Sequence, residues 1–387
     1  MASSHRLDMG AHREPRTRWR PQPTLLGSEY ASAEVFQLER ERIFHATWFC
    51  AARGDALAEP RDFTVVDVAG ESVILLRDEQ GGLRAFFNVC RHRGSRLCEG
   101  GGRLARAIRC PYHAWSYGLD GSLLATPNVA QDEQLPRDQF GLVPVALELW
   151  DGFVWLDLSG AAPPLREQFS RWGSDDPGQW ARYRLGELVV GARREYDVAA
   201  NWKIIVENYN ECLHCPTVHP SLVPVVPLYR FGEVEEEPGE GGSGNRLAEG
   251  LTSFSQTGRS ALPTLPGLTD EDVNTFYGVT LLPNLIINYH SDNVSTFQLF
   301  PQAADRTRVV CDYLFRPETV SAEGFDPSEV VEFRHQLALE DWEVCERAQQ
   351  GVGSSAFAAG GVLPYADRYV HAFHEQYRDM RGVRPPA

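Results

Sequence analysis

The sequence lacks the features of a membrane-inserted or secreted protein. No run among its 387 residues reaches the roughly 18 consecutive apolar side chains from which a membrane-spanning helix is inferred. The basic N-terminal segment, MASSHRLDMGAHREPRTRWRPQP, has no apolar stretch of the kind found in a signal peptide. A transit peptide would share its basic character, but we interpret residues 1–45 as an arm that associates with a catalytic domain. We therefore expect a cytoplasmic protein.

Positive charge, internal repeats and cysteine pairs are also scarce. A net charge of −16 and an isoelectric point near 5.2 argue against nucleic-acid binding. Only one Cys-x2-Cys occurs, Cys212 with Cys215, and without a second pair it does not favour a zinc or redox site. In a cytoplasm we expect six cysteines to be reduced: Cys50, Cys98, Cys212, Cys215, Cys311 and Cys345.

Cysteine and histidine occur together in residues 90–113, CRHRGSRLCEGGGRLARAIRCPYH. Cys90 and His92 form Cys-x-His, and Cys110 and His113 form Cys-x2-His. This is the ligand set of a Rieske [2Fe–2S] cluster, in which two His replace two Cys on one iron. Structural zinc sites use the same residue types, but their two cysteines usually share one loop. The spacing therefore favours the Rieske cluster and single-electron chemistry.

A second group of ligand types lies in the segment NWKIIVENYNECLHCPTVHPS. Glu207, Glu211 and His214 follow the spacing of one helix face, and Pro216 should end that helix. His219 would then fold back towards His214. Two His and one carboxylate form the facial triad of a non-haem Fe(II) oxygenase, so a carboxylate from elsewhere is needed.

Asp341 is the expected third ligand. The Asp-Pro pair at residues 326–327 predicts the start of a helix that ends at Gly351. Asp341 falls on the apolar stripe of that helix, where a carboxylate is costly unless it is paired or binds a metal. A buried salt bridge to Arg334 or Arg347 would give the same sequence signal.

These motifs resemble those of the oxygenase (α) subunit of the Rieske non-haem iron oxygenases, also called aromatic-ring-hydroxylating oxygenases. The two Cys/His loops are followed by ENYNECLHCPTVH and EDWEVCERAQ, in the family's order, between about Trp48 and Gly351. The resemblance implies that His214, His219 and Asp341 bind the mononuclear iron. It also implies electrons that come from NAD(P)H through a separate flavin/iron–sulfur reductase.

The resemblance further assigns roles around the second motif. In the family a carboxylate bridges an iron histidine to a Rieske histidine across a subunit boundary. By position that carboxylate is Glu211, which would link His214 to His113 of a neighbouring subunit in a homotrimer. Asn208 matches a residue close to the iron. Glu207 would either form a salt bridge next to the bridging carboxylate or take part in a proton-transfer path.

The identity of the bridging carboxylate bears on the reaction. Ring-hydroxylating dioxygenases usually have Asp at the bridge, whereas Glu211 and the wording ENYNECLHCPTVHP are more similar to carnitine, choline and glycine-betaine monooxygenases. This favours monooxygenation of a C–H bond next to nitrogen, followed by loss of a methyl group. The alternatives are aromatic-ring (di)hydroxylation and, in another class, a Rieske electron carrier.

Aromatic residues around the second site leave the substrate open. They would suit an aromatic cage for a quaternary ammonium ligand, but equally a pocket for an arene, and most must be core. They are Tyr209, Tyr229, Phe231, Phe254, Phe276, Tyr277, Tyr289, Phe297 and Phe300.

The predicted fold is α+β with two main domains. Residues 63–76 alternate in polarity and turn at Ala69-Gly70, and similar short strands predict a β-rich Rieske domain over residues 46–158. Residues 159–387 combine strand patterns with the two ligand helices. They predict a catalytic domain with helices packed on an antiparallel sheet.

Overall fold

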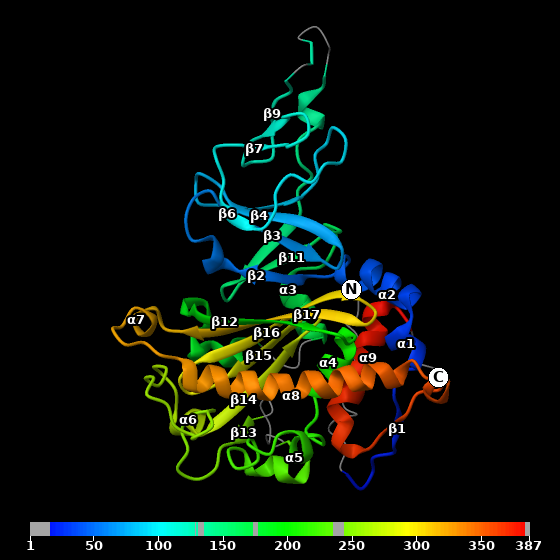
Figure 1. The fold of residues 1–387 in the computed structure, drawn as a ribbon, viewed down its shortest axis with the longest axis vertical. Coiled ribbons are helices and arrows are strands. Elements are labelled where there is room, and N and C mark those ends of the chain that lie inside the picture. The colour runs from blue at the N-terminus through cyan, green and yellow to red at the C-terminus, as the bar shows by residue number, and fades with distance from the viewer. Residues whose placement is uncertain (1–15, 128, 131–134, 173–176, 235–243, 384–387) are drawn as a thin grey trace, which may run out of the picture. The chain divides into compact units, whose positions relative to one another are not determined.

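The computed structural model describes residues 16–127, 129–130, 135–172, 177–234 and 244–383, so the first fifteen residues of the predicted arm lie outside it. The chain divides into two compact units, one of Phe44–Ala162 and the other of the segments up to Ile43 and from Pro163 onward (Figure 1). None of the described helices is long and apolar enough to cross a membrane.

The smaller unit consists of three antiparallel sheets, with strand orders β10-β11-β2, β5-β4-β3-β6 and β7-β8-β9. The predicted hairpin is present: β3 and β4 are joined by Ala69 and Gly70, both at positive φ. The strands are β2 (Phe49–Arg53), β3 (Asp62–Val68), β4 (Glu71–Arg77), β5 (Leu83–Phe87), β6 (Gly101–Arg103), β7 (Ile108–Arg109), β8 (Ser116–Tyr117), β9 (Leu123–Ala125), β10 (Ala146–Trp150) and β11 (Phe153–Asp157).

The larger unit is built on a six-stranded antiparallel sheet of order β12-β17-β16-β15-β14-β13. Its strands are β12 (Val189–Val198), β13 (Gly244–Arg246), β14 (Thr275–Leu281), β15 (Leu285–Tyr289), β16 (Val294–Ala303) and β17 (Arg306–Phe315). A two-stranded sheet pairs β1 (Gln22–Pro23) with β18 (Val362–Leu363). The α+β prediction is therefore confirmed.

Helices surround this sheet, and α8 is the longest of those described (Figure 1). They are α1 (Gly27–Ala31), α2 (Ala33–Glu39), α3 (Leu165–Trp172), α4 (Trp202–Tyr209), α5 (Cys215–Val218), α6 (Asp270–Val273), α7 (Pro317–Val320), α8 (Ser328–Val352) and α9 (Arg368–Arg381). Helix α8 begins two residues after Asp326, whose carboxylate accepts the backbone N–H of Ser328. Its apolar stripe is buried at Val330, Phe333, Leu337 and Cys345.

Helix α8 crosses one face of the sheet. On this face Tyr313 of β17 donates to the Val331 carbonyl of α8, and the ring of Phe297 in β16 lies 6.0 Å from that of Trp342. Tyr289 of β15 points to the opposite face, where it stacks on Trp180. Strand residues therefore alternate between the α8 face and its opposite, as the pleat requires.

Buried charge ties α4 to the N-terminal arm and to α9. The Lys203 ammonium, fully buried on α4, lies 2.5 Å from a carboxylate oxygen of Glu39, which ends α2. The same carboxylate accepts hydrogen bonds from Trp202 and from Tyr377 of α9. A fully buried ion pair is stable only when its remaining hydrogen bonds are satisfied, and these donors satisfy Glu39. Through this carboxylate, α4 is held to both α2 and α9.

Candidate metal centres

Two loops of the smaller unit present the Rieske motif in the same way. Cys90 accepts the backbone N–H of Gly94, and Cys110 accepts that of Ala114 at the equivalent place. Gly94 and Ala114 both have positive φ, which turns each loop back on itself. Each loop therefore presents a buried thiol at its start and an imidazole two or three residues later.

The side chains of these loops fit an iron–sulfur cluster. The imidazoles of His92 and His113 lie with ring centroids 4.7 Å apart, and the buried Nδ1 of His113 has no hydrogen-bond partner within the described residues. Burial would raise the pKa of the Cys110 thiol, but backbone N–H groups of Tyr112 and His113 donate to its sulfur and leave the pKa lowered. A thiolate held this way is the form that binds iron.

Two aromatic residues support the Rieske ligands. Trp115 stacks on His92 with ring centroids 4.7 Å apart, and the Tyr117 hydroxyl lies 3.2 Å from the Cys90 sulfur. Hydrogen bonds to sulfur tune the potential of such a cluster. Sequence analysis did not single out Tyr117, because it lies outside both motifs and reaches Cys90 only through the pairing of β8.

The second motif does not form one continuous helix, so that prediction was wrong. Helix α4 ends at Tyr209, and Pro216 lies in the first turn of α5 instead of ending a helix. Proline is tolerated there because the first helical N–H groups have no partner within the helix. The intervening turn is held by Glu211, whose carboxylate accepts the backbone N–H groups of Leu213 and His214.

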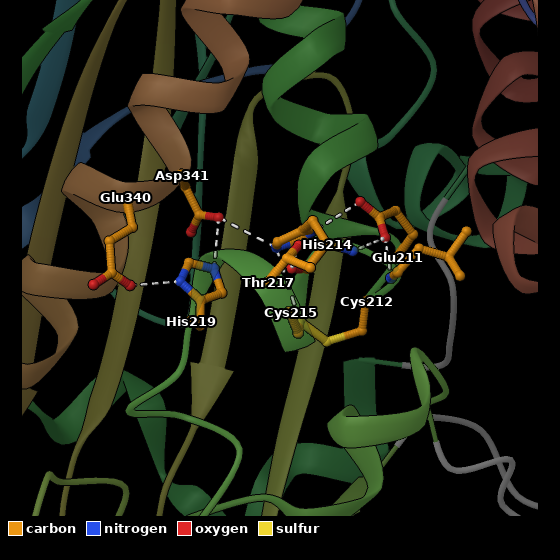
Figure 2. Close-up of a disulfide and its surroundings, with 9 residues drawn as sticks. Glu211, Cys212, His214, Cys215, Thr217, His219, Glu340 and Asp341 are labelled. Carbon is orange, nitrogen blue, oxygen red and sulfur yellow. Dashed lines mark hydrogen bonds and ion pairs between the residues drawn. A yellow bond between two sulfur atoms is a disulfide. The ribbon is translucent and has the colours of Figure 1, made fainter.

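The side chains of His214, His219 and Asp341 converge (Figure 2). One ligand atom from each lies within 4.8 Å of the others. Nε2 of His219 is 2.9 Å and Nε2 of His214 is 3.3 Å from the same Asp341 oxygen. Asp341 reaches the site from α8, where the alternative partner Arg347 is paired with Glu343 instead. The structure thus places Asp341 against the two histidines and not in a salt bridge to arginine.

Two further carboxylates form hydrogen bonds with Nδ1, the ring nitrogen of each histidine that does not contact Asp341. Nδ1 of His214 lies 2.6 Å from Glu211, and Nδ1 of His219 lies 2.7 Å from Glu340 (Figure 2). Metal-binding histidines commonly donate their second N–H to a carboxylate, which fixes the tautomer and the ring orientation. Both inner Nε2 atoms therefore point towards Asp341, and the donor set fits Fe(II).

Three carboxylates, those of Asp341, Glu211 and Glu340, contact the two histidines of this site. Burial opposes the charged form of His214, but its hydrogen bonds to Asp341 and Glu211 raise the pKa to about 10. Burial likewise opposes ionisation of Asp341, yet the two imidazoles lower its pKa to about 2. A divalent cation would satisfy the same carboxylates in place of protons, so metal binding and protonation compete here.

The other predicted site residues lie on α4. Glu207 accepts hydrogen bonds from Tyr30 of α1 (2.8 Å) and from Nε2 of His374 of α9 (2.9 Å). Asn208 is half-buried on the same helix. Sequence analysis missed Glu340, although it adjoins Asp341, because only the orientation of α8 against α5 brings it to His219.

Cys212 and Cys215 form a disulfide, so the expectation that these two are reduced was wrong. Their Cα atoms are 5.0 Å apart, and the bond encloses His214 in a four-residue loop (Figure 2). Cys212 lies in the turn held by Glu211, and Cys215 begins α5. The other four cysteines expected to be reduced are free thiols.

Known families match both units. Residues 47–144 match the Rieske [2Fe-2S] domain, and residues 185–382 match the ring hydroxylating alpha subunit (catalytic domain). The carnitine monooxygenase oxygenase subunit of Acinetobacter pittii is 30% identical over 337 residues, 86% of either chain. The glycine betaine monooxygenase oxygenase subunit of Chromohalobacter salexigens is 30% identical over 379 residues, 88% of this chain and 83% of that protein.

Solved structures show the same fold. The crystal structure of the quaternary ammonium Rieske monooxygenase CntA in complex with L-carnitine matches with a TM-score of 0.75 and 26% identity, over 97% of this chain and 99% of that one. Naphthalene 1,2-dioxygenase from Rhodococcus sp. shares the fold at 23% identity, with a TM-score of 0.75 over 94% of this chain and 95% of that one. With both catalytic motifs inside matched domains, the chain belongs to the Rieske non-haem iron oxygenases, as an oxygenase (α) subunit that carries a [2Fe–2S] cluster and mononuclear iron.

Proposed function

We propose that this oxygenase hydroxylates a small quaternary ammonium compound at a C–H bond next to nitrogen. The observation that carries the proposal is the 30% identity to carnitine and glycine betaine monooxygenase subunits over most of each chain. The reaction balances as substrate C–H, O2, NAD(P)H and a proton giving C–OH, water and NAD(P)+. If the hydroxylated carbon is an N-methyl group, the C–N bond then breaks and releases formaldehyde and a tertiary amine.

The residues that would hold the cofactors follow from the geometry above. When bound, the cluster supplies single electrons and the iron activates O2. The expected cluster ligands are Cys90, His92, Cys110 and His113, and the expected iron ligands are His214, His219 and Asp341. Glu211 and Glu340 would hold the ring proton of each imidazole on Nδ1. Each Nε2 would then be unprotonated and oriented towards the iron.

We further propose that Glu211 joins the two centres of neighbouring subunits in a homotrimer. One of its oxygens accepts from Nδ1 of His214, and a carboxylate can accept further hydrogen bonds on its two oxygens. By the family resemblance the second imidazole is His113 of a neighbouring subunit. The separate reductase would deliver NAD(P)H electrons to the cluster in the cytoplasm, where we place the protein because that donor is made there.

Oxygen uptake coupled to NADH and a Rieske-oxygenase reductase tests the substrate class. The panel is carnitine, glycine betaine, choline and small aromatic acids, with product identification by mass spectrometry. We expect oxygen uptake matched by hydroxylated or demethylated product only for the quaternary ammonium compounds. Coupled uptake confined to the aromatic acids, with ring-hydroxylated products, would overturn the proposal.

A further inference from the structure

Arg334 is a buried cation two turns before Asp341 on α8. Arg334 lies between the helix and the sheet, and it is only 9% exposed. Asp341 follows seven positions later, which is about two helical turns. The two residues therefore share a helix face, with their Cα atoms roughly 10 Å apart along the axis. Arginine keeps its charge in proteins, so the guanidinium must be neutralised or stabilised in place.

Aromatic rings and one neutral imidazole surround this guanidinium. Its central carbon lies 4.8 Å from the ring centroid of Phe254, 5.6 Å from Phe297 and 5.8 Å from Phe276. Nη2 lies 3.5 Å from Nε2 of His290. Burial, together with the charge of Arg334, lowers the pKa of His290 well below its usual range, so His290 is uncharged. Rings offset part of the desolvation penalty of a cation but do not neutralise it.

No carboxylate within the described ranges lies in ion-pair distance of Arg334, and its Nε has no hydrogen-bond partner there. Glu332, two positions earlier in the chain, pairs with Arg194 instead. A buried charge left without its counter-ion is strongly destabilising. This makes Arg334 unusual in a chain whose net charge is −16.

Neighbouring donors on the sheet are unpaired as well. Since Arg334 donates to Nε2 of His290, the imidazole proton belongs on Nδ1, and this buried atom has no partner in the described part of the chain. Asn288, two residues earlier in the chain, has a buried and unpaired Nδ2. Its side chain faces α8 and α4, because Tyr209 of α4 donates to its Oδ1 at 2.7 Å. Three buried donors on this face therefore lack an acceptor within the described part of the chain.

We propose that Arg334, together with His290, binds a carboxylate of the substrate. This rests on the proposed function and narrows its substrate class to zwitterions that carry both a quaternary ammonium and a carboxylate. The planar guanidinium matches a carboxylate with two parallel hydrogen bonds. The opposite end of the zwitterion then lies towards Asp341, where the carboxylates of Glu211 and Glu340 also favour a cation.

This polarity assigns a role to the aromatic residues that sequence analysis left open. A quaternary ammonium group would be repelled from rings that already hold the Arg334 cation. The rings around Arg334 would therefore line the pocket for the carboxylate end of the substrate and would not form the cage for its ammonium group. They belong to Phe254, Phe276 and Phe297. A compound without a carboxylate, such as choline, would leave the guanidinium unpaired and bind more weakly.

Calorimetric binding to the holoenzyme tests the proposal without relying on turnover. The probes are the quaternary ammonium compounds glycine betaine, L-carnitine and choline, with a small aromatic acid tested beside them. Arg334→Met is compared with Arg347→Met, which replaces an exposed arginine on the same helix. We expect Arg334→Met to weaken binding of the two carboxylated probes about a hundredfold, the size of losing one partner of a buried charge pair. Choline binding should stay within a few-fold of wild type. Arg347→Met should change neither.

The thermal midpoint separates this role from ordinary packing. Because the charge has no carboxylate partner among the described residues, Arg334→Met should unfold at or above the wild-type temperature without ligand. If Arg334→Met instead lowers the midpoint and weakens all three probes equally, the carboxylate site is refuted while the proposed function stands. If no quaternary ammonium probe binds but an aromatic acid binds in an Arg334-dependent way, the anion site stands and the proposed function fails. Carboxylated probes bound equally by wild type and Arg334→Met also refute the site.

Discussion

At the scale of single residues, Glu340 governs how His219 is presented to the metal. Its carboxylate lies 2.7 Å from Nδ1 of His219, the counterpart of Glu211 on His214. Loss of such an outer partner commonly lowers metal affinity ten- to a hundredfold. We expect Glu340→Ala to weaken Fe(II) binding by about that factor, measured by anaerobic titration, while the visible spectrum of the cluster stays unchanged.

Glu343→Ala provides the control for this experiment. Glu343 is an exposed acid on the same helix, paired only with Arg347. Like Glu340→Ala, the Glu343→Ala substitution removes one negative charge from α8, but it does so one helical turn away from the residue that contacts His219. If both variants lose iron to the same degree, the effect is general electrostatics and Glu340 has no positioning role.

Asp367 is a second residue whose environment has a measurable consequence. Burial, followed by the negative charges of Glu211 and Glu207, raises its pKa to about 7. Since an unfolded Asp ionises near 3.9, the folded state binds this proton more tightly than the unfolded state. The free energy of unfolding should therefore fall as the pH rises from about 4 to about 7, and stay low above it.

Asp367→Asn removes this titration without changing the side chain's size. We expect the variant to be more stable than wild type at pH 8 and to lose that advantage towards pH 4, as measured by urea unfolding at each pH. Equal stability differences at both pH values would contradict the raised pKa.

At the scale of elements, the connection between α4 and α5 carries the iron motif. Helical spacing over residues 207–214 predicts one continuous helix, yet α4 ends at Tyr209. Asn210 ends the helix by hydrogen-bonding its side chain back to Val206, and Glu211 then takes up backbone N–H groups of the turn. Local capping outweighed the periodic pattern, because a polar side chain offers backbone groups an alternative to the helix.

The Cys212–Cys215 disulfide should stabilise this connection. Closing so short a loop contributes about 2 kcal/mol to the free energy of unfolding in the chain-entropy model. We expect the double variant Cys212→Ser/Cys215→Ser to unfold at lower denaturant concentration and to bind Fe(II) more weakly, because His214 lies inside the loop.

A thiol reductant supplies the internal control for that experiment. It should shift the unfolding midpoint of wild type towards that of the double variant and leave the double variant unaffected. Wild type that unfolds identically with and without reductant, with free thiols counted to confirm reduction, would mean that the bond contributes nothing.

At the level of the whole molecule, the proposed electron path through Glu211 requires assembly into the proposed homotrimer. Glu211→Gln should keep both metal sites, yet lower the single-turnover rate of cluster oxidation ten- to a hundredfold, because an amide cannot accept from two imidazoles as a carboxylate does. Stopped-flow absorbance of the cluster measures this rate.

Mixed trimers test whether the path crosses between subunits. Combining Glu211→Gln subunits with His113→Ala subunits should restore part of the activity, since some contacts then join an intact Glu211 to an intact His113. Verified mixed trimers without any recovery, or a fully active Glu211→Gln enzyme, would sink intersubunit transfer through this residue.

The chemistry of the ligand loops and the class of fold could be predicted from local patterns of residues. Cys-x-His, Cys-x2-His and the pair His214 and His219 lie within short segments, so their spacing alone restricts which metals they suit. Strand alternation and the Ala69-Gly70 turn were equally local, and the β3–β4 hairpin confirmed them. Neighbouring residues encode short-range geometry, which is why the strand and turn predictions were confirmed.

Which remote side chains meet could not be predicted in this way, because it depends on how the helices and the sheet pack. Asp341 and Glu340 reach His219 across more than a hundred residues of chain, and the stripe on α8 could not distinguish a histidine partner from an arginine. Arg334 reads in the sequence as an available salt-bridge partner, yet packing places it among aromatic rings without a carboxylate in the described residues. Burial and pairing of charges depend on how helix and sheet pack, and no local pattern contains that information.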